Sequence, residues 1–121
     1  MNTINATIME VLSENENGNA VVWLRLNCDN HPFPIYHKFY VGFLGDLYRI
    51  QFLIKNTKAI NIDDLKGKSV RVIDNGEVRN YLIAIGSPSK NRFVDLKGDE
   101  FPVSERRIYW RYKLRELFTI H

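Results

Sequence analysis

The sequence predicts a mainly β fold of the α+β class: an OB-like small barrel in the order β-β-β-α-β-β, followed by a basic amphipathic C-terminal helix. Five segments of the 121-residue chain have the composition of strands, and an Asn-Gly pair lies inside each of two predicted hairpins. A segment with helical spacing separates the third strand from the fourth. This order is that of the OB-fold, a five-stranded Greek-key barrel. A sheet with helices on one face is the alternative arrangement.

The first predicted hairpin joins residues 3–14 to residues 20–28, two runs rich in Ile, Val and Thr. Asn17-Gly18 lies between them and supplies the positive backbone dihedrals that a tight hairpin turn needs. With this turn, Glu10 lies opposite Arg25. One face of the hairpin is then apolar and predicted to be core, with Met9, Val11, Val22, Leu24 and Leu26. The opposite face is mixed, with Ile8, Glu10, Leu12, Trp23 and Arg25.

A third strand and a helix come next. Two prolines within residues 29–34 interrupt the second strand, and residues 35–41 alternate as a strand does. From Phe43 the apolar residues recur at helical spacing, which predicts a helix that ends near Asn56. The apolar positions of this predicted helix are Phe43, Leu47, Ile50 and Ile54.

The second predicted hairpin joins residues 69–74 to residues 77–86 around Asn75-Gly76. A two-residue turn there places Val72 opposite Arg79 and Val70 opposite Tyr81. The composition of residues 92–96 also allows a short sixth strand.

The chain is predicted to be a single domain, residues 1–121, made of a β-rich body (1–96) and a basic aromatic element (104–121). The second part holds five Lys or Arg and two Asp or Glu, whereas the other 103 residues hold twelve of each sign. It therefore carries the whole formal net charge of +3. Both a strand and a helix capped by Ser104 fit its pattern, and the composition of residues 114–118 favours the helix. The helical stripe is then Arg107, Trp110, Leu114, Leu117 and Phe118.

Two segments hold the candidate binding residues. Arg and Lys neutralise phosphates while Tyr and Trp stack on bases, but the same residue types also dominate protein interfaces. The candidates are Arg106, Arg107, Tyr109, Trp110, Arg111, Tyr112, Lys113 and Arg115 in the C-terminal element, with Trp23 and Arg25 in the second strand. The competing interpretation is structural. In it, Trp110 and Leu114 pack against the barrel, Trp23 packs under the helix or the C-terminal element, and Arg25 simply pairs with Glu10.

The sequence offers little for catalysis or metal binding. It has no Gly-rich phosphate loop, nucleophile elbow or HExxH motif, so no enzyme activity, catalytic residue or cofactor is predicted. Cys28, His31 and His37 are irregularly spaced and too few for a structural zinc site, so no metal is predicted. No apolar run is long enough to span a membrane, no secretory signal precedes the first strand, and Cys28 is the single cysteine. These features predict a cytoplasmic protein.

One stretch carries a resemblance. Residues 64–72 read Asp-Leu-Lys-Gly-Lys-Ser-Val-Arg-Val and are followed by Ala84-Ile85-Gly86 and Arg92-Phe93. This pattern resembles one found in small phage and prophage proteins of unsettled function, and the resemblance covers roughly residues 4–95. Ser87 stands where that pattern has His, and residues 42–45 only loosely match its Gly-Gly-Tyr segment. The resemblance implies a viral origin rather than an activity.

Three functions of different classes fit these features. The first is a non-enzymatic phage or mobile-element protein that binds and inhibits a host defence protein, as an anti-CRISPR does, in the host cytoplasm. The second is a single-stranded nucleic-acid-binding OB protein of phage replication or recombination. The third is a protein that binds a nucleotide signal. The expected partner is thus a host protein such as a nuclease, or single-stranded nucleic acid, with no membrane; the chain is a monomer or a homodimer.

Overall fold

The computed structural model describes residues 1–29, 31–76 and 82–119. It confirms the mainly β class and the predicted order of elements. The elements are β1 (Asn2–Glu16), β2 (Asn19–Cys28), β3 (Ile35–Tyr40), α1 (Leu44–Thr57), the short 3-10 helix η1 (Asp63–Leu65), β4 (Ser69–Asp74), β5 (Leu82–Gly86), β6 (Phe93–Asp95) and α2 (Glu105–Thr119).

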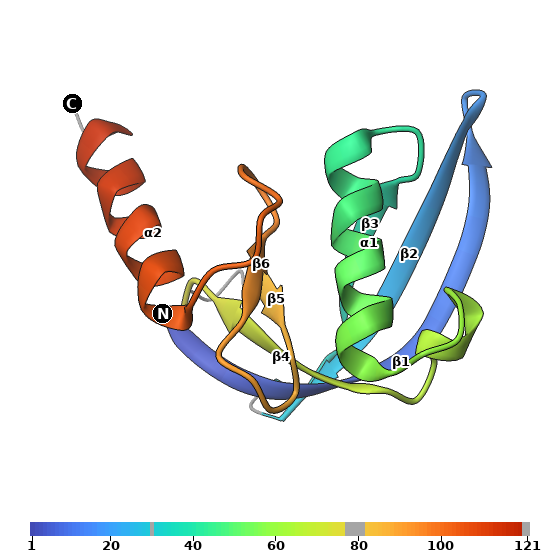
Figure 1. Cartoon of the computed structure of the whole chain (residues 1–121), viewed down its shortest axis with the longest axis horizontal. Coiled ribbons are helices and arrows are strands. Elements are labelled where there is room, and N and C mark those ends of the chain that lie inside the picture. The colour runs from blue at the N-terminus through green and yellow to red at the C-terminus, as the bar shows by residue number, and fades with distance from the viewer. Residues whose placement is uncertain (30, 77–81, 120–121) are drawn as a thin grey trace.

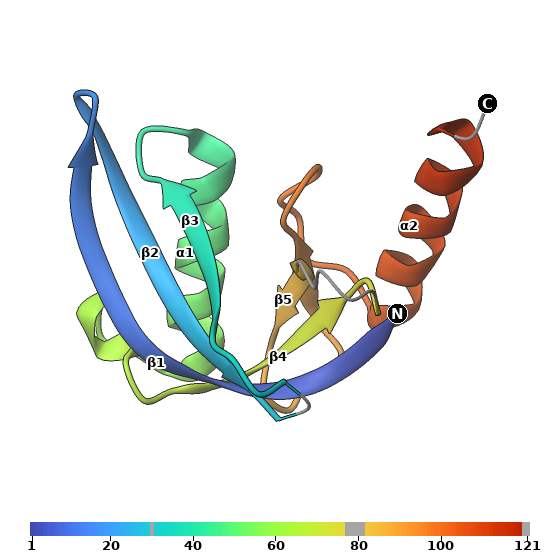
Figure 2. The same ribbon diagram turned by 180° about the vertical axis from the view of Figure 1, so that it is seen from behind.

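All six described strands form one antiparallel sheet in the order β3-β2-β1-β4-β5-β6. This sheet curls into a half-barrel, because the long strand β1 bends and serves both halves (Figures 1 and 2). Residues 6–16 of β1 pair with β2, while residues 2–7 pair with β4. The strand order is OB-like, but β3 and β6 are the two edges of the described sheet and do not meet.

The first hairpin has the predicted turn. Asn17 and Gly18 both adopt positive φ, of 51° and 84°, and Glu10 lies opposite Arg25. One detail of the prediction is wrong. A β-bulge between Ile8 and Glu10 pairs Ile8 with Leu26, so Ile8 is buried whereas Met9 is exposed. A bulge adds one residue to one strand and so exchanges the faces on either side of it.

The main core lies between the concave face of the sheet and α1. Ile50 and Leu53 of α1 pack in one cluster with Leu24, Phe39 and Val72 of the strands. The helix starts one residue after the predicted Phe43 and ends one residue after the predicted Asn56. The predicted helix therefore has nearly the right ends, but its buried face differs: Phe43 is exposed, and Phe52 and Leu53, which the predicted spacing omitted, are buried.

The pairing register predicted for the second hairpin is wrong. Val72 pairs with Ile85 and Asp74 with Leu82, so Val72 does not lie opposite Arg79. Arg79 and Tyr81 lie outside the described residues. All five residues of β5 are buried. Leu82 and Ile85 pack in the main core beside α1, whereas Ile83 and Ala84 pack in the cluster beneath α2. A strand that is apolar on both faces carries no alternation to set its register.

The C-terminal element is the predicted helix and begins after Ser104, whose Oγ accepts a hydrogen bond of 3.3 Å from the Arg107 N–H. Helix α2 packs on the face of β4, β5 and β6 that is turned away from α1. There Ile108 joins a second cluster with Ile73, Ile83, Ala84 and Phe93. The predicted sixth strand is also present, as β6. None of the helices within the described residues combines the length and apolar character needed to cross a membrane.

Candidate functional site

One side of α2 is fixed to the body of the protein. Ile108 is buried in the second cluster, and Tyr109 and Tyr112 pack partly against it. The hydroxyls of Tyr109 and Thr3 share a hydrogen bond of 2.7 Å, which joins α2 to the start of β1. Both tyrosines were candidate binding residues, and the structure uses them to dock the helix.

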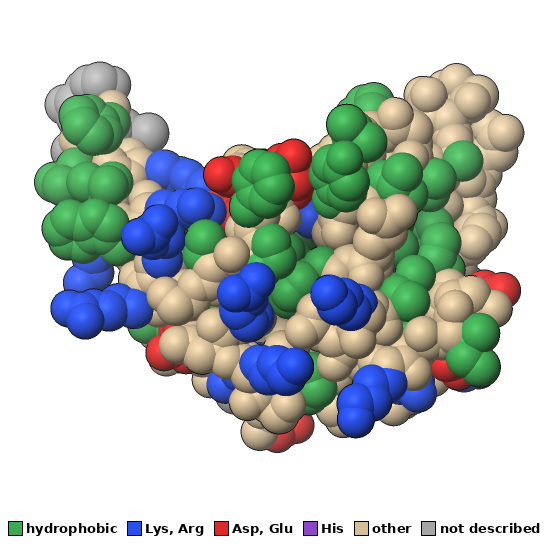
Figure 3. Space-filling model, viewed as in Figure 1, with side chains coloured by type: hydrophobic (Ala, Val, Ile, Leu, Met, Phe, Trp, Pro, Cys, Tyr) green, Lys and Arg blue, Asp and Glu red, His purple; other side chains and the backbone are tan. Residues whose placement is uncertain are grey.

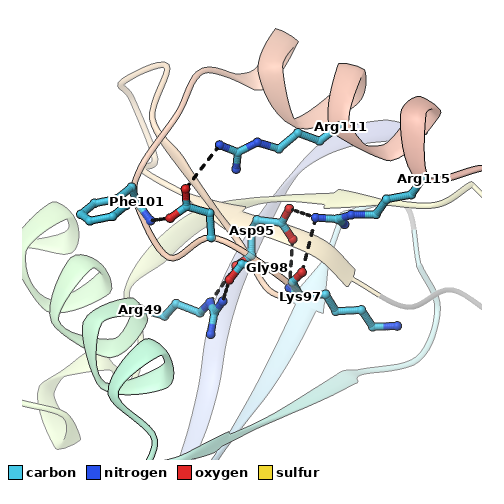
Figure 4. Close-up of polar contacts among 8 residues, drawn as sticks. Arg49, Asp95, Lys97, Gly98, Phe101, Arg111 and Arg115 are labelled. Carbon is cyan, nitrogen blue, oxygen red and sulfur yellow. Dashed lines mark hydrogen bonds and ion pairs between the residues drawn. The ribbon is translucent and has the colours of Figure 1, made fainter.

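Two of the candidate arginines also face the body (Figure 4). Arg115 makes an ion pair with Asp95, a buried residue of β6, and Arg111 lies 4.0 Å from the Asp99 carboxylate. These carboxylates offset the charge of both guanidinium groups. Arg115 therefore orients α2, and Arg111 faces the body as well, although its Nη1 is buried there without a hydrogen-bond partner among the described residues.

The segment that receives these arginines is held from the other side by α1 (Figure 4). Buried Arg49 donates hydrogen bonds to the Asp95 carbonyl at 2.7 Å and to the Gly98 carbonyl at 2.5 Å. It also pairs with Asp46 at 2.9 Å. Residues 95–99 thus connect the two helices through polar contacts, and α2 has a defined orientation.

The opposite side of α2 carries exposed apolar side chains. At about 100° of rotation per residue, positions i, i+4, i+7 and i+8 lie on one helix face. The residues at these positions, with their exposed fractions, are Trp110 (63%), Leu114 (37%), Leu117 (69%) and Phe118 (79%). We call them the α2 stripe. Figure 3 shows hydrophobic side chains along the outer edge of this helix, away from the sheet.

Three cations accompany the α2 stripe. Arg106, Arg107 and Lys113 are exposed and make no ion pair within the described part of the chain. Together with Trp110 they line a shallow depression beside the start of α2. The outer side of α2 is therefore apolar towards its C-terminal end and cationic towards its N-terminal end.

Trp23 and Arg25 do not join this surface. They lie on the β1–β2–β3 half of the sheet, whereas α2 covers the β4–β6 half, at the opposite end of the molecule (Figures 1 and 2). Arg25 pairs with Glu10 at 3.0 Å. The Lys38 ammonium lies 5.2 Å from the Trp23 ring centroid.

Lys38 itself is held in place by Glu16. Its ammonium donates a hydrogen bond of 2.8 Å to the Glu16 carboxylate, and this bond raises the pKa of Lys38. Trp23 and Arg25 are thus partly occupied by neighbours on the sheet.

The three residues considered as metal ligands, Cys28, His31 and His37, differ in protonation and in hydrogen bonding. Burial raises the pKa of the Cys28 thiol to about 11, so it stays protonated at neutral pH. Burial lowers the pKa of His37 to about 4, and the His31 ring hydrogen-bonds the Phe33 carbonyl at 2.9 Å. Within residues 1–29, 31–76 and 82–119, no three His, Cys, Asp or Glu side chains gather to hold a metal.

The predicted binding residues therefore fall into three groups. Arg106, Arg107, Trp110 and Lys113 face solvent together; Tyr109, Arg111, Tyr112 and Arg115 dock the helix; Trp23 and Arg25 lie elsewhere. The prediction omitted Leu114, Leu117 and Phe118 as binding residues, although their helical spacing was visible in the sequence.

No family model, curated protein or solved structure matches this chain. The resemblance to phage proteins thus stays a prediction.

Proposed function

We propose that this chain is a non-enzymatic phage or mobile-element protein that binds and inhibits a host defence protein in the host cytoplasm, and that the α2 stripe is its docking surface. The observation that carries the proposal is the exposure of four apolar side chains on the outer side of α2. The inner side of the same helix is fixed by Ile108 and by ion pairs. An apolar face that remains on a helix already docked marks a surface available to a partner.

A protein partner fits the α2 stripe better than nucleic acid does. Burying one such side chain contributes about 1.5–3 kcal/mol to binding. A protein groove offers the apolar surface that buries it, whereas a phosphate backbone does not. Two of the five cations of the C-terminal element are already paired with Asp95 and Asp99. The cations left exposed flank the stripe rather than form a track for a strand. Nucleic acid is therefore the weaker candidate at this surface.

The partner surface has a definable chemistry. An amphipathic helix binds by laying its i, i+4 and i+7 side chains into an apolar groove. Arg106, Arg107 and Lys113 would meet carboxylates at the rim of that groove, because complementary charge steers association. We infer a partner groove that is apolar at its centre and acidic at one end.

A second copy of this chain fits less well. A symmetric contact centred on the middle of the stripe would bring Lys113 close to its own counterpart, and like charges at an interface disfavour pairing.

The class of the partner rests on the resemblance of residues 64–72 and 84–86 to small phage proteins. Inhibition of a defence protein, for example a CRISPR nuclease, is the activity that suits such an origin.

Placing a charge within the stripe tests the proposal. Leu117→Glu places a carboxylate in the apolar contact, while Ile60→Glu makes the same change at an exposed residue outside α2. Each variant is mixed with purified defence nucleases, and both complex formation on gel filtration and DNA cleavage are measured. We expect Leu117→Glu to weaken inhibition by about tenfold or more, as for loss of a central interface residue. Ile60→Glu should inhibit as the unchanged protein does.

Full inhibition by Leu117→Glu would remove the stripe from the interface. Binding to a labelled single strand that falls steeply with salt and needs Arg106 and Arg107 would instead support the nucleic-acid alternative. A dimer on gel filtration that Leu117→Glu dissociates would assign the stripe to self-association.

A further inference from the structure

A second concave surface lies on the other helix, between α1 and the two loops that flank β6. The groove has a volume of about 570 Å³, within the range typical of ligand sites. Helix α1 forms one wall, and the two loops on either side of β6 form the other. The lining of the groove is Tyr48, Gln51, Phe52, Lys55 and Asn56 from α1, Lys90 and Arg92 before β6, and Glu100, Phe101 and Pro102 after β6.

The groove is cationic. Lys55, Lys90 and Arg92 are exposed and make no ion pair in the part of the chain that the structure describes. Among the described lining residues Glu100 is the one carboxylate, so their formal charge is +2. This charge matches a phosphate monoester, which carries about −1.5 to −2 at neutral pH. In Figure 3, Lys and Arg side chains gather on both sides of the gap between α1 and the β6 loops.

The same groove offers flat apolar surfaces. Phe101 and Tyr48 are exposed on opposite walls, while Phe52 is buried beneath them. Aromatic rings at such positions accept a stacked base of any identity. The Gln51 carboxamide adds a donor and an acceptor that can pair with a base edge.

The walls of the groove are held in place by arginines that do not line it. Arg71 donates hydrogen bonds to the Ser87 carbonyl at 2.9 Å and to the Lys90 carbonyl at 2.5 Å. Arg49 fixes the other loop through the carbonyls of Asp95 and Gly98. Because these loops are tied to β4 and α1, the groove exists before a ligand arrives, which lowers the entropic cost of binding.

We infer that this groove binds a phosphorylated base, either a free nucleoside monophosphate or one unit of a single strand. Lys55, Lys90 and Arg92 hold the phosphate, and the rings of Tyr48 and Phe101 stack on the base. Stacking rings alone or unpaired cations alone do not identify a ligand. Together they match the base and the phosphate of a nucleotide. The inference does not depend on the α2 stripe, which lies on the other helix.

Binding is tested by calorimetry with four probes at low salt: AMP, GMP, a short oligothymidylate and inorganic phosphate. Lys55→Glu reverses one charge in the groove, and Lys66→Glu makes the same change at an exposed residue outside it. We expect Lys55→Glu to weaken nucleotide binding by about tenfold, since charge-assisted contacts to phosphate are strong. Phe101→Ala should weaken it by about tenfold through lost stacking. Lys66→Glu should change it less than about twofold.

The probes separate the two sources of the ligand. Binding of AMP or GMP identifies a free nucleotide, whereas binding of the oligothymidylate alone identifies a strand; both outcomes support the inference. Three outcomes would overturn it: no binding of any probe, binding of phosphate as tight as that of AMP, or equal loss in Lys55→Glu and Lys66→Glu. Circular dichroism of each variant verifies that the exposed substitutions leave the fold intact.

Discussion

His37 is the residue at which solution pH acts most clearly on this fold. Its ring lies on β3 against α1 and meets the Phe39 ring edge-on, with 4.6 Å between centroids. Burial lowers its pKa to about 4; Asp46 opposes this shift, and Arg49 adds to it. The folded protein therefore keeps His37 neutral at a pH where the unfolded chain protonates it.

This difference predicts a loss of stability in mild acid. In the unfolded chain the pKa of histidine is about 6.5, so the unfolded state binds the extra proton between pH ~6.5 and ~4. The free energy of unfolding should fall across this window by up to about 3 kcal/mol. Urea unfolding at a series of pH values measures it. His37→Gln, which cannot titrate, should have a flatter profile; equal slopes for the two proteins would contradict the assignment.

Single carboxylates also determine which Lys and Arg side chains of the C-terminal element remain available to a partner. Five cations in ten residues identified the C-terminal element as a binding candidate, but Arg111 and Arg115 meet Asp99 and Asp95 in the folded chain. Those carboxylates lie 12 and 20 positions earlier in the sequence. No local periodicity reveals a partner that only the fold brings near, so the split between docking and free cations could not be predicted.

At the scale of elements, turn residues and apolar spacing predicted the limits of an element correctly where one of its faces meets solvent. The Asn17-Gly18 turn and the limits of α1 follow from positive φ and from an apolar face at helical spacing. The register of β4 with β5 failed because β5 is buried on both faces. Helix α2 was predicted, but its more apolar side is exposed, and the side that docks combines Ile108 with tyrosines and arginines.

Strands β5 and β6 approach so closely that only glycine fits at one position. A Cβ atom on Gly86 would lie 2.3 Å from the Phe93 ring and 2.7 Å from the Arg92 carbonyl oxygen. Because the second neighbour is backbone, Gly86→Ala should destabilise the fold by about 1–3 kcal/mol, as overpacking does. Thermal unfolding measures the loss. Gly42→Ala, where a Cβ meets no atom within 4 Å, is the control, and an unchanged melting temperature for Gly86→Ala would contradict the packing.

At the scale of the whole molecule, the order of elements was predictable and the shape was not. The pattern of three strands, a helix and two strands gave the OB-like order. The curvature of β1 and the separation of β3 from β6 depend on pairings across the whole sheet. The same holds for the cationic groove, because only the fold brings Lys55 of α1 beside Lys90 and Phe101 of the loops that flank β6.

The two proposed surfaces belong to different helices of one half-barrel. The α2 stripe is an exposed ridge suited to a protein groove, and the groove beside α1 is a hollow suited to a small anionic ligand. Arg49 and Arg115 meet on the β6 segment between them (Figure 4). Each surface can be altered by exposed substitutions without disturbing that shared segment.

Hydrogen exchange of the chain alone and in complex with an inhibited defence nuclease tests the central claim most directly. In the free protein the last turn of α2, after Arg115, should exchange quickly, because the end of a helix beyond its tertiary contacts frays. In the complex we predict strong protection of amides in residues 110–118 and unchanged exchange in β2 and β3. Protection confined to β2 and β3, with the last turn of α2 still exchanging quickly, would contradict the assignment of the α2 stripe as the docking surface.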